Sequence, residues 1–174
     1  MAPQHLPGLT QPLTGWLGHQ APFDFADSYR PANSIEAMRV GTPPILSLSA
    51  LDAALEVFAD VDLAAVKAKA DCLFDIFTAE IAARCPELGL LTPTEPGRRG
   101  TQVSLRFPEA YAVMQALIAR DVIGDFRQPD ILRFGLTPLY LSHYDIWRAA
   151  GILGAIMAEM TWDRPDYKVR AKVV

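Results

Sequence analysis

Arg133 is the residue of this sequence whose type and setting point most directly to ligand chemistry. It stands between Leu132 and Phe134, in a stretch expected to form a strand. An arginine buried there would need an anionic partner, and its planar guanidinium can bind a carboxylate through two parallel hydrogen bonds. Its residue type therefore suits a clamp for an amino-acid substrate, although the setting alone favours a structural arginine. Two alternatives stay open: an arginine on the solvated face of an edge strand, or one paired with Asp130.

Trp16 and Thr42 form a second set of candidates, for an anion. The indole N–H and the threonine hydroxyl can both donate hydrogen bonds, which suits a phosphate dianion. Gly41, beside Thr42, would let the backbone approach an anion closely. Taken alone, the two residues favour structural roles: packing for Trp16 and a turn for Thr42.

The remaining polar residues give weaker signals. His19 is a possible titrating group, although a structural hydrogen bond is the favoured interpretation, and Asp125 is read as a solvated turn or a partner of Arg127. Cys72 and Cys85 lack metal-ligand spacing, and both are expected as buried thiols in or at the end of a helix. The sequence contains no Gly-rich phosphate loop and no metal motif, so we assign no metal site.

The composition is that of a globular chain. Hydrophobic residues make up 51% of its 174 residues and charged residues 21%, with a mean hydropathy of +0.14. The net charge of −4 and the pI of about 5.3 provide no basic field for nucleic acid or anionic lipid. The one basic pair, Arg98 and Arg99, is expected in a solvated turn. No signal peptide or membrane span is recognisable, which predicts a cytoplasmic protein.

The first third of the chain changes character at about residue 45. Residues 1–44 are rich in Pro and Gly and show little periodicity. Helical spacing of apolar residues begins at Ser47, with Ser49 as the expected N-cap. A second, longer helix should start near Asp62 and end before Pro86.

The rest of the chain alternates short strands and helices. Strands are expected at 88–91, 102–107, 122–126 and 131–134, and helices at 108–120 and from Ser142, in a capping box with Asp145, to Met160. This order predicts a layer of helices against a mostly antiparallel sheet.

Three segments together resemble kynureninase, the pyridoxal-phosphate (PLP) enzyme that cleaves kynurenine to anthranilate and alanine. They are Gly-Trp-Leu-Gly-His at 15–19, Gly-Thr-Pro-Pro-Ile at 41–45 and Arg-Phe-Gly-Leu-Thr-Pro-Leu-Tyr at 133–140. The likeness extends over essentially the whole chain. It implies that Trp16 and Thr42 contact the PLP phosphate, across a dimer interface, and that Arg133 binds the α-carboxylate of the substrate.

The resemblance also implies a fold and a domain plan. The chain would be the C-terminal part of a fold-type-I PLP enzyme, which is α/β as a whole and α+β when this part is taken alone. Residues 1–60 would be an arm and the end of the large PLP-binding domain, 61–85 a connecting helix and 86–174 the small C-terminal domain. In the family the lysine that binds PLP lies upstream of the Trp-containing segment, and none of the four lysines here matches its context. The resemblance therefore assigns no catalytic residue to this chain.

Two classes of function follow from the resemblance. The first is the C-terminal portion of a kynureninase of tryptophan catabolism, acting on kynurenine or its 3-hydroxy derivative. It would be inactive alone and would pair in a homodimer or with the missing N-terminal portion. The alternative is a non-catalytic dimerisation or interaction module derived from a PLP enzyme. A third possibility, a desulfurase-like PLP lyase, is disfavoured by the Gly-Trp-x-Gly-His segment.

Overall fold

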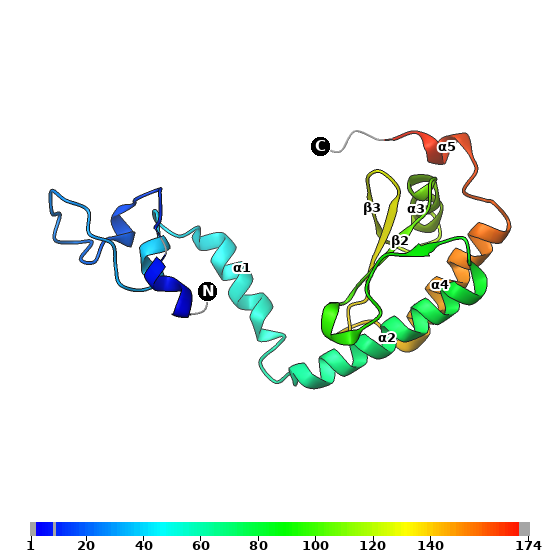
Figure 1. Cartoon of the computed structure of the whole chain (residues 1–174), viewed down its shortest axis with the longest axis horizontal. Helices are drawn as coiled ribbons and strands as arrows, with labels where there is room; N and C mark the ends of the chain where they lie inside the picture. Colours follow the sequence, from blue (N-terminus) through cyan, green and yellow to red (C-terminus); the bar gives the residue numbers. More distant parts are fainter. Residues whose placement is uncertain (1–2, 9, 171–174) are drawn as a thin grey trace. The chain divides into compact units, whose positions relative to one another are not determined.

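The chain divides after residue 61 into two units that differ in secondary structure. The computed structural model describes residues 3–8 and 10–170, and the chain separates into two units, residues 1–61 and 62–174 (Figure 1). The first holds short 3-10 turns and one helix, and the second holds the sheet and four α-helices in its described part. The finer assignment to a large-domain end, a connecting helix and a small domain stays a prediction.

The first unit is built mostly from turns. Its elements are the 3-10 turns η1 (Pro3–Gly8), η2 (Trp16–Gly18) and η3 (Ile35–Met38) and the helix α1 (Ile45–Glu56).

Helix α1 begins earlier than the sequence pattern indicated. Its N-cap is Pro44, whose carbonyl accepts a hydrogen bond from the Leu48 amide at 3.0 Å. The prediction of Ser49 as N-cap is wrong, since Ser49 lies inside the helix. The helix starts where the proline pair ends, because a proline cannot donate the hydrogen bond that a helix interior needs.

The second unit opens with α2 (Leu63–Arg84), as predicted. The Asp62 side chain caps this helix by accepting a hydrogen bond from the Ala64 amide at 2.8 Å. One stripe of the helix is buried, formed by Ala70, Leu73, Phe74, Phe77 and Ile81.

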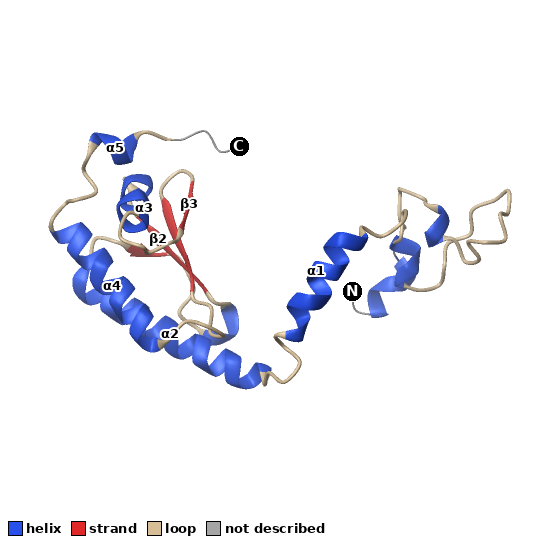
Figure 2. Ribbon diagram, turned by 180° about the vertical axis from the view of Figure 1, so that it is seen from behind, coloured by secondary structure: helices blue, strands red, loops and turns tan. Residues whose placement is uncertain are grey.

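A four-stranded antiparallel sheet packs against the helices of this unit, which confirms the predicted fold class (Figure 2). The strands are β1 (Gly89–Leu90), β2 (Gln102–Arg106), β3 (Asp125–Arg127) and β4 (Ile131–Gly135), and their order in space is β1-β2-β4-β3. Strand β4 is therefore an interior strand, hydrogen-bonded to β2 on one side and to β3 on the other.

Three further helices complete the second unit: α3 (Ala110–Ile118), α4 (His143–Ala158) and α5 (Pro165–Lys168). The predicted capping box of α4 is present, because Ser142 and Asp145 each accept a hydrogen bond from the other's amide. The core lies between the sheet and helices α2, α3 and α4, and its fully buried residues include Leu73, Phe77, Leu105, Leu117, Leu132, Leu153 and Ile156.

Strand β3 starts three residues later than the predicted 122–126. The chain first has to leave α3, and it does so through Asp121, whose φ of 61° is left-handed. The Val122 amide then reaches back to the Leu117 carbonyl at 3.0 Å, a helix ending in which the left-handed residue satisfies free carbonyls.

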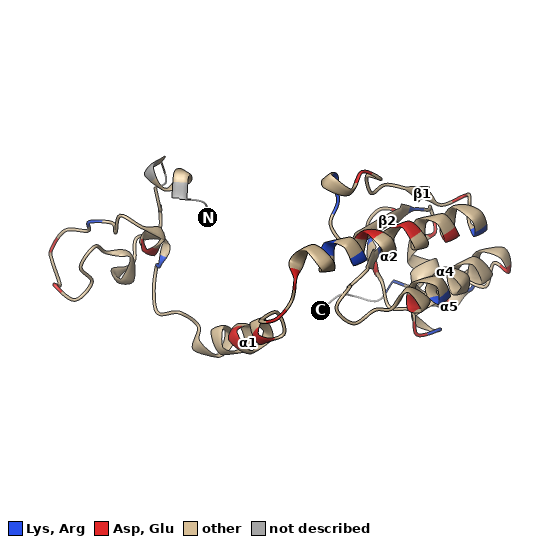
Figure 3. Cartoon of the chain, turned by 90° about the horizontal axis from the view of Figure 1, so that it is seen from below, with Lys and Arg blue, Asp and Glu red and all other residues tan. Residues whose placement is uncertain are grey.

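Arg99 corrects the expectation of a solvated basic turn. Its side chain is only 1% exposed and forms ion pairs with Asp71 at 3.2 Å and Asp75 at 3.4 Å. Its guanidinium also lies 3.8 Å from the centre of the Phe74 ring. All three partners belong to α2, whose acidic and basic residues are visible in Figure 3. The arginine therefore fastens the loop before β2 to this helix, whereas Arg98 remains exposed.

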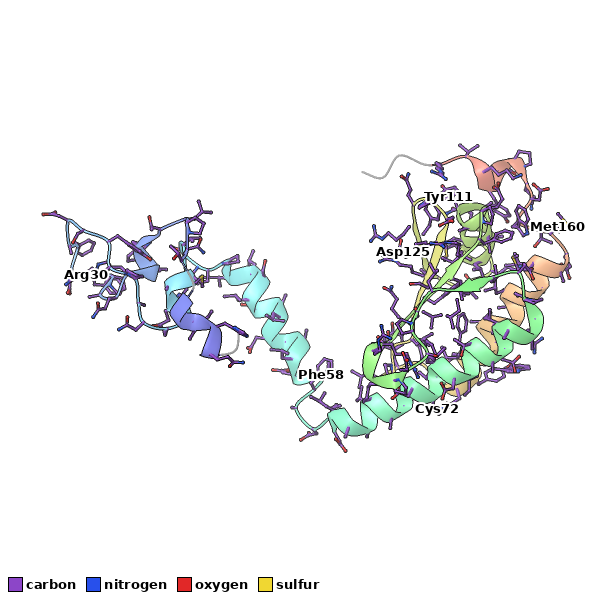
Figure 4. All side chains as sticks on the ribbon, in the orientation of Figure 1. Arg30, Phe58, Cys72, Tyr111, Asp125 and Met160 are labelled. Carbon is purple, nitrogen blue, oxygen red and sulfur yellow. The ribbon has the colours of Figure 1, made fainter. Side chains whose placement is uncertain are left out.

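The two cysteines differ in exposure, so the prediction of two buried thiols is wrong for Cys72. Cys72 is exposed on α2 (Figure 4), whereas Cys85 is buried at the end of that helix. Burial, with a smaller contribution from Glu87, raises the pKa of the Cys85 thiol to about 11. At neutral pH its reactive thiolate form is correspondingly scarce.

We expect one thiol of the native chain to react with Ellman's reagent at neutral pH and the second to react only after denaturation. The Cys72→Ser variant should lose the fast-reacting thiol, and Cys85→Ser should keep it. Equal reaction rates for the two thiols in the native chain would contradict the burial of Cys85.

The described part of the chain contains no helix long and apolar enough to cross a bilayer. Within residues 3–8 and 10–170 there is also no group of three or more His, Cys, Asp or Glu side chains arranged to bind a metal ion.

Candidate functional site

The sheet register places Arg133 in the middle of the sheet face opposite the core. Arg133 on β4 lies directly across from Ser104 on β2 and Asp125 on β3. Side chains alternate along a strand, and the neighbours Leu132 and Phe134 are buried in the core. Arg133 must therefore project from the other face. Figure 4 shows Asp125 on the side of the sheet away from α3.

The partner of Arg133 is Asp125, the residue that faces it across the strands. The Nε and Nη2 groups of Arg133 both donate to one oxygen of Asp125, Oδ2, with an Nε–Oδ2 distance of 3.1 Å. The two alternatives drawn from the sequence, the solvated face of an edge strand and a pair with Asp130, are thus wrong in one detail each. Strand β4 is not an edge strand, and Asp130 pairs with Arg106 at 3.4 Å instead.

Asp125 also has a second basic neighbour, as the sequence indicated. The Nε of Arg127 lies 3.4 Å from the same Oδ2 oxygen. The hydrogen bond from Arg133, more than any other influence, holds the pKa of the Asp125 carboxyl below its usual range. At neutral pH the carboxylate is therefore ionised and lies between two guanidinium groups.

A shallow hollow of about 290 Å³ lies beside this pair. The Nη1 group of Arg133 has no hydrogen-bond partner among residues 3–8 and 10–170. The hollow is lined by Gln102, Ile123, Gly124, Asp125, Arg133, Phe134, Gly135, Thr137 and Tyr140. It combines an arginine with hydrogen-bonding capacity to spare, the ionised Asp125 that pairs with it, and three neutral polar side chains. The unengaged guanidinium nitrogen can donate to a small carboxylate.

Gly124 lets β3 approach β4 at this point. A Cβ added there would lie 2.7 Å from the Arg133 carbonyl oxygen and 2.7 Å from the Met114 methyl carbon. Since real Cβ atoms do not come so close to backbone, a larger residue would push β3 away and take Asp125 with it. Glycine at this position therefore supports the pairing of Asp125 with Arg133.

In the first unit, the Trp16 and Thr42 segments lie side by side. A Cβ on Gly15 would overlap the Val40 carbonyl oxygen, and one on Gly18 would lie 2.9 Å from the Ala37 carbonyl oxygen. The two glycines thus permit direct backbone contact between the segment that carries Trp16 and the segment that leads to Thr42. At Gly41, by contrast, the space that a Cβ would occupy is open.

The polar groups of Trp16 and Thr42 are available for a ligand. Trp16 is half exposed and packs edge-on against Phe23, with ring centres 5.5 Å apart. Neither the Trp16 indole N–H nor the Thr42 hydroxyl has a hydrogen-bond partner in the described part of the chain. Trp16 also lines a hollow of about 370 Å³ with His19, Ala21, Pro22, Phe25, Ala26, Ser28 and Tyr29.

His19 has a structural role, in line with the sequence interpretation. Its Nδ1 accepts a hydrogen bond from the Ala21 amide at 2.9 Å, and its Nε2 lies 3.2 Å from the Ser28 carbonyl oxygen. With both ring nitrogens engaged and the side chain buried, His19 ties together the two ends of the loop that follows it.

The site residues expected from the sequence belong to different units. Trp16 and Thr42 lie in residues 1–61 and Arg133 lies in residues 62–174. The sequence did not identify Asp125 as the partner of Arg133, nor Gln102 and Tyr140 as its neighbours in the hollow. Asp125 could have been predicted from its place opposite Arg133 in two strands joined by a short turn. That prediction requires the strand register, which the sequence alone does not give.

The family model of the kynureninase C-terminal domain matches residues 66–153, about half of the chain. The chain belongs to the kynureninase family. The matched stretch includes Asp125 and Arg133 with the strands that carry them, so the carboxylate-binding candidate lies in the kynureninase C-terminal domain.

Whole-chain relatives agree with the domain match. The chain is 44% identical to the kynureninase of Pseudomonas fluorescens over 175 residues, which cover 99% of this chain and 42% of that protein. It is also 44% identical over 172 residues to the kynureninases of Burkholderia mallei (strain SAVP1) and Burkholderia pseudomallei (strain K96243), which covers 98% of this chain and 41% of each relative. The chain thus spans about two fifths of the length of these kynureninases.

Proposed function

We propose that this chain forms the C-terminal portion of a PLP-dependent kynureninase that hydrolyses L-kynurenine, or 3-hydroxykynurenine, to L-alanine and the matching anthranilate. The observation that carries the proposal is the arrangement at Arg133. This arginine stands on the face of an interior strand away from the core and is bound to Asp125 through one edge. Its Nη1 lies beside a hollow and is not engaged by any described residue. An amino-acid carboxylate is the ligand that this geometry fits.

Arg133 would act by binding and orienting the substrate. Its charge-assisted hydrogen bonds would hold the α-carboxylate. A substrate fixed at its carboxylate presents the rest of its skeleton in a defined direction. We assign no proton-transfer role to Arg133, since an arginine stays protonated in proteins.

The first unit fits the phosphate of PLP. Trp16 and Thr42 offer an N–H and an O–H that no described residue engages, on segments brought together by Gly15. These donors would hold the phosphate. PLP, when bound, supplies the electron-withdrawing ring that makes cleavage of a carbon–carbon bond accessible. We further propose that these contacts are made within a homodimer, across the subunit interface; the cytoplasmic location stays a prediction.

A chimeric enzyme tests the proposal. Residues 1–174 would replace the 175 aligned residues of the Pseudomonas fluorescens kynureninase. We expect this chimera to release anthranilate from L-kynurenine, measured by anthranilate fluorescence, and the 174-residue chain alone to release none, because no lysine in it matches the PLP-binding context. Circular dichroism and PLP absorbance would establish that the chimera is folded and loaded. A folded, PLP-loaded chimera without turnover would contradict the proposal.

The exposed apolar side chains of α1 favour a second candidate function, an interaction module without its own catalysis. Ile45, Leu46, Leu48, Leu51 and Leu55 are all exposed in the first unit, and such a row commonly marks a protein–protein contact. This candidate requires that the tagged chain retain a full-length kynureninase subunit in a pull-down. A pull-down that recovers no kynureninase subunit would contradict this second candidate function.

A further inference from the structure

Asp125 occupies only one edge of the Arg133 guanidinium. Both hydrogen bonds, from Nε and from Nη2, end on the single oxygen Oδ2, and Nη1 has no partner in the described part of the chain. A carboxylate can bind a guanidinium side-on, through Nε and one terminal nitrogen, or end-on, through the two terminal nitrogens. The side-on position is filled from within the protein, and the end-on position is left for a ligand.

The position of Asp125 is fixed by the sheet. It is the direct cross-strand partner of Arg133, so the pairing follows from the β3–β4 register. Gly124 permits the close approach of the two strands at this point. A carboxylate held by two paired strands is a more rigid support than one on a loop.

Asp125 also separates two like charges. Its Oδ2 lies 3.4 Å from the Arg127 Nε as well as within hydrogen-bonding distance of Arg133. Without the carboxylate, two guanidinium groups would face each other across β3 and β4, and their repulsion would favour other rotamers of Arg133. The carboxylate thus offsets the repulsion between the two arginines and also binds Arg133 directly.

We propose that Asp125 is a positioning residue for carboxylate binding, which holds the Nε–Nη2 edge of Arg133 so that its terminal nitrogens meet the ligand in a fixed orientation. This inference rests on the proposed role of Arg133 as the substrate clamp. Because the arginine is ordered before the ligand arrives, binding loses less side-chain entropy.

If Asp125 hindered the ligand instead, its removal would change the carboxylate affinity in the opposite direction. If Asp125 were an internal competitor that must leave before a ligand binds, its removal would tighten carboxylate binding. Simple charge also predicts tightening, because removal of a negative group makes the site more attractive to an anion. Weaker binding after removal of Asp125 is therefore specific to positioning.

The test uses the 15N-labelled 174-residue chain with L-kynurenine as the probe. The NMR signal of the Arg133 Nε–H group, assigned by its loss in Arg133→Lys, reports both ligand binding and the order of the side chain. We expect a saturable shift in the parent chain. In Asp125→Ala we expect about three- to tenfold weaker binding and a more mobile Nε–H, from the lost pre-ordering of one long side chain.

Asp166→Ala is the matched control, since Asp166 is an exposed aspartate paired with Arg164 at 3.6 Å. It removes the same charge from unit 62–174 and should leave the affinity unchanged. The backbone amide spectrum reports whether Asp125→Ala keeps its fold, and Asp125→Asn takes its place if it does not.

The outcomes separate the inference from the function on which it rests. Saturable binding that is equal or tighter without Asp125 overturns the positioning role and leaves the Arg133 clamp standing. No saturable shift of the Arg133 signal in the parent chain overturns the clamp and, with it, the inference. Weaker binding with a mobile Arg133, and no change in Asp166→Ala, supports both.

Discussion

Replacement of Arg133 by alanine is expected to raise the KM for L-kynurenine roughly 10- to 150-fold in the chimeric enzyme, with little change in kcat. The variant loses hydrogen bonds to a charged group worth roughly 1.5–3 kcal/mol, and each 1.4 kcal/mol corresponds to about a factor of ten in affinity. The α-carboxylate itself is chemically unchanged by the reaction. Its contact with Arg133 should therefore contribute about equally to the bound substrate and to the transition state, which is the pattern that changes KM alone.

Arg133→Lys separates charge from geometry in the same enzyme. Lysine keeps the positive charge and lacks the planar fork, so we expect a KM between those of the parent chimera and Arg133→Ala. A lysine that restores the parent KM would show that the site needs only a positive charge.

Arg106→Ala is the matched control for the alanine variant. Arg106 belongs to the strand next to β4 and is also paired with an aspartate, Asp130, at 3.4 Å. It is exposed and does not line the hollow beside Arg133, so its removal should leave KM unchanged. Equal effects of the two substitutions would indicate a general loss of sheet stability, and an unchanged KM in Arg133→Ala would contradict the clamp.

Elements of the second unit could be predicted because their signals are local. Helix α2 starts near Asp62 as expected, with Asp62 as its cap, and Ser142 with Asp145 forms the expected capping box of α4. In each case a short polar side chain precedes a run of apolar residues at helical spacing, and the hydrogen bonds involved join residues two or three positions apart. Such bonds depend little on the rest of the fold.

The contacts that escaped prediction depend on how separate elements pack or pair, not on a local pattern. Arg99 reaches Asp71 and Asp75 on α2 across more than twenty positions, and no short pattern identifies an acidic pair on a separate helix as its partner. Asp125 escaped for a related reason. Its pairing with Arg133 depends on strand register, and a shift of one residue would turn every side chain of the strand to the other face.

The phosphate site proposed for the first unit stays a prediction, but the structure adds one feature that the sequence did not show. The residue types of Trp16 and Thr42 suit an anion but, taken alone, favoured structural roles, and the sequence did not reveal that their segments touch. That contact depends on Gly15, whose missing side chain makes room for the Val40 carbonyl. The two donors could be named from the sequence. The contact between their segments could not, because it depends on the space left by a glycine.

Phe77→Ala is expected to remove about 3–5 kcal/mol from the free energy of unfolding of the second unit, a large part of the about 5–15 kcal/mol typical of a whole domain. Phe77 is 1% exposed, and its ring centre lies 5.1 Å from that of Phe134 on β4. Loss of the ring leaves a space that the sheet and α4 can only partly fill.

Native-state hydrogen exchange measures this loss in the unit concerned. The best-protected amides of α2 and β4 open only when the unit unfolds, so their protection should fall by roughly two to four orders of magnitude. Phe58→Ala is the control, since Phe58 is an exposed phenylalanine of the first unit and its loss should cost no more than about 0.5 kcal/mol. Unchanged protection in Phe77→Ala would contradict the packing described for this core.

The same substitution connects the core to the candidate site. Phe134 directly follows Arg133 on β4, and the two side chains project from opposite faces of the sheet. A strand that loses its packing against α2 holds its register with Asp125 less firmly, so Phe77→Ala should also make the Arg133 Nε–H more mobile. The Arg133 Nε–H could instead stay rigid while hydrogen-exchange protection of the core amides falls. That result would show that the pairing with Asp125 fixes the guanidinium without help from the packing of Phe77.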